Sequence, residues 1–509
     1  MTRILLMIIF PFYLIPTLGL MVYGLNCYVL LLLFRRRYRA AQQASTDMDQ
    51  RTSDAAPGEA WPAVTTQIAV YNELNVVERI MRAVAAMEYP GGHHEIQVLD
   101  DSNDETCRVV DRVAAELTTQ GHDIKVLRRE KRLGYKAGAL AEGLRQASGE
   151  FVAVFDADFV PPPTFLTSTV PFFADNPELG LVQTRWGHLN RQTSLLTRAQ
   201  SVGIDGHFVI EQVARCWNRL YMNFNGTAGV WRRAAIEAAG GWSWDTLTED
   251  LDLSYRMQFA GWETQYLPNV VVPAELPENI NALRGQQFRW AKGSIQTLIK
   301  LFPRLVRSPA PLFKKVQAVL HMGGYLVHPM MFMLALLALP VLAIKEGLHL
   351  SPIFYATLAL PLCLSILAPS TLYFVSQRAI YSDWKHRIAL LPFLIVVGVG
   401  LAISNTKAIG EAIIGKESPF VRTPKSGEQE VKRYRAKWPW LALIEIAMGL
   451  FSASTFGIYV AAGQYLTSPF LAIYAAGFLF VGMLTLCHSL NLTGGTMLRV
   501  TPKPVPQPA

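Results

Sequence analysis

Hydrophobic positions divide the chain into an apolar beginning, a mixed middle and a largely apolar second half. The first apolar stretch runs from Ile4 to Phe34 and is followed by basic residues at 35–39. It is longer than the roughly 20 residues that cross hydrocarbon, although Pro11 and Pro16 are positions where it could break. Its length and the lack of a small-residue cleavage site favour a retained anchor over a signal peptide. We expect a transmembrane anchor over residues 1–40, with the basic cluster in the cytoplasm.

The second half of the chain contains several apolar stretches that predict membrane helices. The basic stretch 416–437 should be cytoplasmic, so a single crossing by residues 388–406 would place it on the wrong side. We favour an interfacial or partly inserted helix there; the alternative is that a neighbouring segment does not span fully. The apolar stretches are 316–344, 352–377, 388–406, 438–462 and 468–490. We assign residues 316–407 to transmembrane or interfacial helices, 438–490 to transmembrane helices and 491–509 to a Pro-rich tail.

The middle of the chain alternates short apolar runs with helical patterns. A small, polar linker at 41–60 precedes it, and residues 61–280 have the composition of a soluble α/β domain. Strands alternating with helices predict a largely parallel sheet covered on both faces, which binds ligands at the carboxyl ends of its strands. The predicted strands are 66–71, 95–99, 124–127 and 150–155, and the predicted helices are 76–87, 108–117 and 136–146.

Composition supports an integral membrane protein. Of the 509 residues, 51% are hydrophobic and 17% charged. The net charge of +8 lies largely beside the apolar segments, so membrane topology and anionic lipid explain it better than nucleic-acid binding. The five cysteines are scattered, and we expect neither a disulfide framework nor a structural zinc site.

Acidic residues follow three of the predicted strands. The first strand ends in Tyr71-Asn72-Glu73, the second in Asp100-Asp101 and the fourth in Asp156-Ala157-Asp158. These strand ends should converge on one cleft, where alternate carboxylates can hold a divalent cation together with the diphosphate of a nucleotide. Lys136 opens a predicted helix, and phosphate is favoured at such a helix start.

Three later segments add candidate chemistry. Thr248-Glu249-Asp250 opens a helix, where its acids either complement the helix dipole or supply a general base. The two glycines of the segment 224–229 (FNGTAG) allow backbone to approach a bulky acceptor, or form a plain turn. Residues 284–304 combine cations with apolar side chains and predict an amphipathic helix on the membrane, within an interface region at 281–315. There Arg289 is placed to contact pyrophosphate and Trp290 to stack on a sugar, although Trp290 also suits generic anchoring.

The ordered set YNE, DDSND, DAD, FNGTAG, TED and QQFRW resembles the membrane-integrated, processive branch of glycosyltransferase family 2, which includes cellulose, curdlan, mannan, chitin and hyaluronan synthases. The likeness covers about residues 64–425. It implies a GT-A catalytic domain of Rossmann-like α/β type beside an α-helical transmembrane domain. It also implies a nucleotide-sugar donor, Mg²⁺ or Mn²⁺, and inversion at the anomeric carbon.

The resemblance also assigns roles to individual residues. Asp250 is expected to be the base, Asp156 to contact the donor and Asp158 to hold the metal. A gating-like loop is expected within 408–437, where Val421 and Arg422 make the match to the family pattern F-x-V-T-x-K partial. The expected donor contacts are Asn72, Glu73, Asp101, Lys136, Gln286 and Arg289; the acceptor contacts are Trp290, Gly226, Thr227 and Glu249; the loop contacts are Phe420, Val421, Thr423 and Lys425.

The implied function is transfer of a sugar from a UDP-glucose or GDP-mannose type donor to the non-reducing end of a growing β-linked polysaccharide. The enzyme would sit in the cell membrane as a multi-pass protein with a cytoplasmic catalytic domain, and would translocate its product. One alternative is a single-sugar transferase acting on a membrane lipid, which the number of apolar segments disfavours. Another is a transporter with a nucleotide-sugar-binding domain, but the apolar segments hold few ionisable residues. The sequence assigns no partner subunit.

Overall fold

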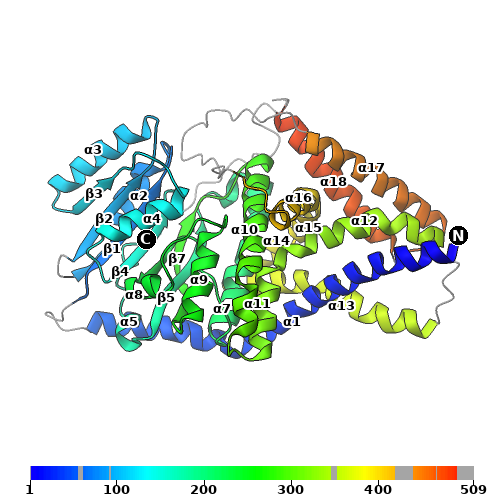
Figure 1. Cartoon of the computed structure of the whole chain (residues 1–509), viewed down its shortest axis with the longest axis horizontal. Helices are drawn as coiled ribbons and strands as arrows, with labels where there is room; N and C mark the ends of the chain where they lie inside the picture. Colours follow the sequence, from blue (N-terminus) through cyan, green and yellow to red (C-terminus); the bar gives the residue numbers. More distant parts are fainter. Residues whose placement is uncertain are drawn as a thin grey trace.

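The computed structural model describes residues 2–54, 61–90, 93–344, 352–418, 440–465 and 467–489. An α/β domain lies at one end of the molecule and a group of long apolar helices at the other, with helix α10 (Ile280–Arg307) between them (Figure 1). Helix α1 (Thr2–Asp54) runs alongside both parts. The two parts therefore share helices that contact each of them.

The α/β domain is built on one seven-stranded sheet with the order β3-β2-β1-β4-β6-β5-β7. Strands β3, β2, β1 and β4 are parallel, β5 is parallel to β7, and β6 is antiparallel to both of its neighbours. The predicted parallel arrangement is confirmed for the first four strands, whereas β6 makes the whole sheet mixed. The strands are β1 (Val64–Val70), β2 (His94–Asp100), β3 (Asp123–Leu127), β4 (Phe151–Asp156), β5 (Leu179–His188), β6 (Gly229–Arg232) and β7 (Glu263–Ala274).

Both faces of the sheet are covered. On β4, Ala153 and Phe155 pack in the core that includes α2 and α3, whereas Val152 and Val154 pack in the core that includes α4. Burial on both faces explains why this strand is apolar throughout. The predicted helices are confirmed as α2 (Val77–Ala85), α3 (Thr106–Thr119) and α4 (Tyr135–Gln146). Further elements are α5 (Phe172–Asp175), η2 (Arg191–Thr193), α6 (Leu195–Asp205), the π-helix η3 (Gly206–Glu211), α7 (Gln212–Cys216), α8 (Arg233–Ala238) and α9 (Glu249–Phe259).

Helix α1 differs from its prediction at both ends. Pro11 and Pro16 lie inside the helix without ending it. The helix also continues through the first part of the expected linker to Asp54. Tertiary contacts favour this continuation, because Met48 is buried in the core of the sheet and the Asn269 side chain of β7 donates a hydrogen bond to the Gln42 carbonyl at 3.1 Å.

From α10 onward, the described residues form helices joined by short turns. The predicted stretch 316–344 is divided between two helices, because a short turn at Gly323 and η4 separates them. Among the described residues, four helices are long and apolar enough to cross a membrane: Pro11–Met48, Gly324–Ala343, Trp440–Ala461 and Ser468–Ser489. The elements are α11 (Leu312–Met322), η4 (Gly324–Leu326), α12 (Val327–Ile344), α13 (Pro352–Ile380), α14 (Trp384–Ile388), α15 (Leu391–Gly400), α16 (Ala402–Ile413), α17 (Trp440–Ala461) and α18 (Ser468–Ser489).

The segment expected to be interfacial or partly inserted is bent. Residues Trp384–Gly400 and Ala402–Ile413 meet at an angle of 43°, which is the geometry of a broken span or a re-entrant loop. Helix α15 packs against α18, and α16 packs against α10. The depth of this bent segment in a membrane stays a prediction.

Candidate active site

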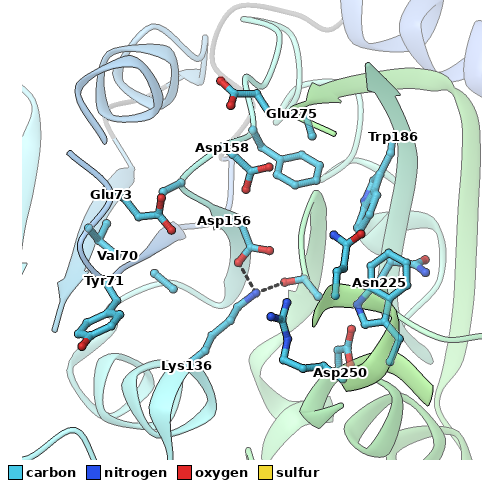
Figure 2. A pocket seen from close by; sticks show the side chains of 18 of the residues that line it. Val70, Tyr71, Glu73, Lys136, Asp156, Asp158, Trp186, Asn225, Asp250 and Glu275 are labelled. Carbon is cyan, nitrogen blue, oxygen red and sulfur yellow. Dashed lines mark hydrogen bonds and ion pairs between the residues drawn. The ribbon is translucent and has the colours of Figure 1, made fainter. Parts of the chain in front are cut away.

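A pocket opens where the carboxyl ends of β1, β2 and β4 meet α9 and α10 (Figure 2). Parallel strands end at the same edge of a sheet, so each strand delivers its following residues to this place. The polar strand ends that the sequence singled out therefore do lie together. The predicted site residues that line the pocket are Glu73, Asp101, Lys136, Asp156, Asp158, Gly226, Glu249, Asp250, Gln286, Arg289 and Trp290.

Lys136 enters the pocket from the first turn of α4. Gly134 precedes the helix with φ of +70°, a conformation that suits glycine and turns the chain sharply into α4. The Lys136 ammonium group donates hydrogen bonds to the Asp156 carboxylate and, at 2.7 Å, to the Gly226 carbonyl (Figure 2). Burial opposes the charged form, but Asp156 and Glu249 outweigh it and raise the pKa of Lys136. A lysine kept charged in this position can neutralise a phosphate group.

The Asp156-Ala157-Asp158 segment closes β4, and both carboxyl groups line the pocket. The backbone N–H of Asp156 donates a hydrogen bond to the Thr227 hydroxyl at 3.0 Å. Thr227 is fully buried and does not line the pocket. This placement differs from the predicted acceptor contact, because the Thr227 hydroxyl holds the end of β4 instead.

Asp101 lies at the end of β2 with two arginines beside it. It accepts hydrogen bonds from Arg129, at 3.0 Å from Nε and also from Nη2, and Arg132 Nε lies 3.9 Å from its carboxylate. The Arg132 guanidinium also stacks 3.3 Å from the centre of the Tyr71 ring. Asp101 therefore forms a fixed wall of the pocket. Asn72 does not line it, and the Asn72 side chain instead donates to Asn103 Oδ1 at 2.9 Å.

Asp250 and Glu249 form the first turn of α9. The Leu251 backbone N–H donates to Asp250 Oδ1 at 2.8 Å. The other carboxylate oxygen faces Gly226, where an added Cβ would lie 3.1 Å from it. Burial, and then the like charge of Glu249, raise the pKa of Asp250 to about 7. Burial also raises the pKa of Glu249. Asp250 thus has the proton affinity that a general base needs near neutral pH.

Helix α10 brings Gln286, Arg289 and Trp290 to the pocket, as predicted. Burial lowers the pKa of Arg289 to about 10, against the opposing attraction of Glu249 and Asp156. The guanidinium therefore remains a cation at neutral pH, opposite the acidic strand ends.

Two other cations of α10 pair with acids of distant helices, whereas the predicted amphipathic helix would lie on the membrane. Arg284 Nη2 donates to Glu445 of α17 at 2.6 Å, and the Lys292 side chain is fully buried, 3.2 Å from Glu411 of α16. Both cations are held inside the protein by acids more than 100 residues away in the chain. The apolar side chains that α10 does expose are Ile299, Phe302 and Val306.

Several pocket residues were not predicted. Trp186 and His188 come from the end of β5, a strand without a recognisable chemical pattern, and His188 Nε2 lies 2.9 Å from Asp205 Oδ1. Asn225 lies in the FNGTAG segment, where only the glycines had suggested a role. The gating-like residues Phe420, Val421, Thr423 and Lys425 lie outside the part of the chain that the structure describes.

Comparison with known proteins decides the family. Residues 62–293 match the family described as Glycosyltransferase like family 2. Glucomannan 4-β-mannosyltransferase 1 of Oryza sativa subsp. japonica is 32% identical over 465 residues, which cover 88% of this chain and 86% of the relative. Glucomannan 4-β-mannosyltransferase 2 of Arabidopsis thaliana is 34% identical over 387 residues, covering 74% of this chain and 70% of the relative. The chain belongs to glycosyltransferase family 2.

The glycosyltransferase is also similar to a solved structure, the mannosyltransferase PcManGT from Pyrobaculum calidifontis in complex with GDP-Man and Mn²⁺. The TM-score is 0.47 at 21% sequence identity, covering 78% of this chain and 100% of that chain. The family match over the α/β domain confirms the predicted GT-A fold, the predicted transferase class and the resemblance to cellulose-synthase-like enzymes.

Proposed function

We propose that this glycosyltransferase transfers a mannosyl or glucosyl unit from a GDP-mannose or UDP-glucose type donor to the non-reducing end of a growing β-linked polysaccharide. The observation that carries the proposal is the position of Asp250, which faces the Lys136–Asp156 pair across Gly226 in one pocket. The relatives support the sugar class, because they are named glucomannan 4-β-mannosyltransferases and match most of the chain.

The proposed reaction is a single displacement. The Asp250 carboxylate accepts the proton of an acceptor hydroxyl as the hydroxyl oxygen bonds to the anomeric carbon of the donor. The bond from that carbon to the diphosphate breaks at the same time, and the nucleoside diphosphate leaves with the bonding electrons. Attack opposite the leaving group inverts the anomeric centre. No covalent intermediate between sugar and enzyme is required.

Cations of the pocket would stabilise the leaving group. Lys136 at the start of α4 and Arg289 on α10 both line the cavity, and both stay charged near neutral pH. Charge that develops on a departing diphosphate is stabilised by such preorganised cations. Trp290, one residue beyond Arg289, presents an indole ring on which the acceptor sugar would stack.

The pocket also fits a divalent cation that is shared with the donor. Within the described residues no group of three or more His, Cys, Asp or Glu side chains forms a complete cage. Mg²⁺ and Mn²⁺ sites commonly take one or two carboxylates and complete the shell with phosphate and water. Asp158, with Asp156 beside it, would hold such an ion, which would neutralise the diphosphate of the donor.

The long apolar helices support a membrane location for this chemistry. The four candidate spans and the bent pair α15–α16 would anchor the enzyme as a multi-pass protein of the cell membrane, with the catalytic domain in the cytoplasm. Helix α10 contacts both the pocket and α18. A glycan held at Trp290 would then leave the pocket toward these helices. We include processive translocation of the product across the membrane in the proposal.

A donor panel tests the proposal. The purified protein is incubated with Mn²⁺ and GDP-mannose, GDP-glucose, UDP-glucose or UDP-galactose, and released nucleoside diphosphate is measured. We expect turnover with one of the first three donors and a product that mannanase or glucanase degrades. A short product that extracts into organic solvent would instead support a lipid acceptor. Absence of nucleoside diphosphate release with every donor would contradict the proposal.

A further inference from the structure

The side chain of Asn225 lines the pocket beside Asp250 and Trp186 (Figure 2). Its carboxamide is held at both ends, because Oδ1 accepts a hydrogen bond from Gln212 and Nδ2 lies 2.9 Å from His207 Nε2. The Asn225 backbone is fixed as well, since its N–H donates to Gln183 Oε1 at 2.9 Å.

One backbone carbonyl sets the direction of these hydrogen bonds. The Gln212 side chain lies 3.0 Å from the Asn223 carbonyl, which can only accept, so the atom that faces it is the Gln212 amide nitrogen. The same nitrogen faces Asn225 and must donate to Oδ1. The amide nitrogen of Asn225 is then the atom that faces His207.

The chain of hydrogen bonds continues through His207 to Glu211. Because Asn225 donates to His207 Nε2, that nitrogen must be unprotonated, and the proton lies on Nδ1. His207 Nδ1 lies 2.9 Å from Glu211 Oε2, so it donates to this carboxylate. Both residues belong to the π-helix η3, a rare geometry that often marks functional sites. The whole network therefore has one hydrogen-bond direction, from Gln212 through Asn225 and His207 to Glu211.

We propose that Asn225 binds a hydroxyl group of the acceptor sugar, and that Gln212, His207 and Glu211 are positioning residues that fix its carboxamide. The inference rests on the proposed function. A carboxamide offers two N–H donors and two acceptor lone pairs, and the network uses one of each. The others remain for a ligand in the pocket. Gly226, the next residue, faces Asp250. The hydroxyl that Asn225 binds therefore belongs to the same acceptor sugar whose attacking hydroxyl loses its proton to Asp250.

Steady-state kinetics with a soluble acceptor test this role. Initial rates are measured with mannotetraose or cellotetraose as the acceptor at saturating donor. The variant Asn225→Ala should raise the KM for the acceptor by roughly ten-fold or more and leave the KM for the donor within about two-fold. The variant Asn225→Ser should show the same loss, because a hydroxyl is too short to reach both neighbours. Asn176→Ala is the matched control, since Asn176 lies outside the pocket lining and its side chain bonds Glu263 and the Glu178 backbone N–H instead of this network.

The positioning residues give a second readout. His207→Ala should raise the acceptor KM to a similar extent, and the double variant with Asn225→Ala should be no worse than either single variant. Glu211→Gln keeps an acceptor oxygen for the His207 N–H and should stay near the wild type, whereas Glu211→Ala should resemble His207→Ala. Independent, multiplying effects, or a raised donor KM with an unchanged acceptor KM, would overturn the inference.

Binding without turnover separates this inference from the proposed function. Binding of the tetrasaccharides is measured by calorimetry to an Asp250→Asn protein with and without Asn225→Ala. A roughly ten-fold weaker binding supports the role of Asn225 even if no donor turns over, in which case only the proposed function fails. Equal binding by both proteins overturns the inference even if the wild type synthesises polymer.

Discussion

Replacing Glu249 by glutamine should shift the pH dependence of sugar transfer to lower pH. Burial and the charge of Glu249 raise the pKa of Asp250 to about 7. Asp250 can accept a proton only in its ionised form, so transfer should rise as the pH rises through about 7. With a pKa of about 7, about 9% of the carboxyl is ionised at pH 6 and about 91% at pH 8, which predicts an increase in kcat/KM of about ten-fold over this interval.

The Glu249→Gln variant removes the like charge and keeps the shape of the side chain. Burial of Asp250 remains, so the midpoint of the pH profile should fall between about 4 and the wild-type value. A midpoint that is lower by one pH unit would mean that the charge of Glu249 disfavours ionised Asp250 by about 1.4 kcal/mol. Lys136 lowers the pKa of Asp250, so Lys136→Met should move the midpoint in the opposite direction.

Released nucleoside diphosphate, measured from pH 5 to pH 9 at fixed Mn²⁺, reports both changes in the midpoint. Asp245→Asn is the control, because Asp245 lies outside the pocket lining and pairs with Lys300. The reasoning is refuted if the wild-type profile is already flat above pH 5, or if the wild-type and Glu249→Gln profiles coincide.

Other predictions concern stability, backbone geometry and metal. Because the pKa of Asp250 is raised, the free energy of unfolding falls as the pH rises from about 4 through about 7. Asp250→Asn should therefore raise the melting temperature at pH 8 but not at pH 4. An equal effect at both pH values would contradict this. Lys292→Met leaves Glu411 without its buried partner and should lower the free energy of unfolding by roughly 3–5 kcal/mol, with recovery on adding Glu411→Gln; unchanged denaturant unfolding would refute it. Gly226→Ala adds a Cβ 3.1 Å from Asp250 Oδ2 at φ of +82° and should lower kcat roughly a hundred-fold; near-normal turnover would show that the close approach is unimportant. EDTA should abolish transfer and Mn²⁺ restore it; full activity in EDTA would exclude the metal role of Asp158.

The sequence predicted those features that depend on local pattern. Apolar runs located the first four strands, three of which end in acidic residues. The parallel order of these strands brought Asp101, Asp156 and Asp158 to one pocket. Local pattern also placed Lys136 and Asp250 at helix starts, where the structure has them.

Features that depend on distant partners were not predictable in the same way. Lys292 has the pattern of a surface cation, but Glu411 and the backbone near Lys416 enclose it. Asn225 is a plain turn residue until the fold brings His207 of η3, 18 residues earlier in the chain, against it. Pro11 was expected as a possible break, yet α1 passes it unbroken. The differences at Lys292 and Asn225 come from tertiary packing that a single sequence does not display.

The role of Asp250 as the base of glycosyl transfer can be tested by one comparison of turnover with donor binding. Nucleoside diphosphate release and donor affinity are measured for the wild type, for Asp250→Asn and for the control Asp245→Asn, with the donor that the panel identifies. The structure predicts that Asp250→Asn loses at least a hundred-fold in release rate while its donor affinity stays within a few-fold of the wild type. Robust turnover by Asp250→Asn would contradict the account.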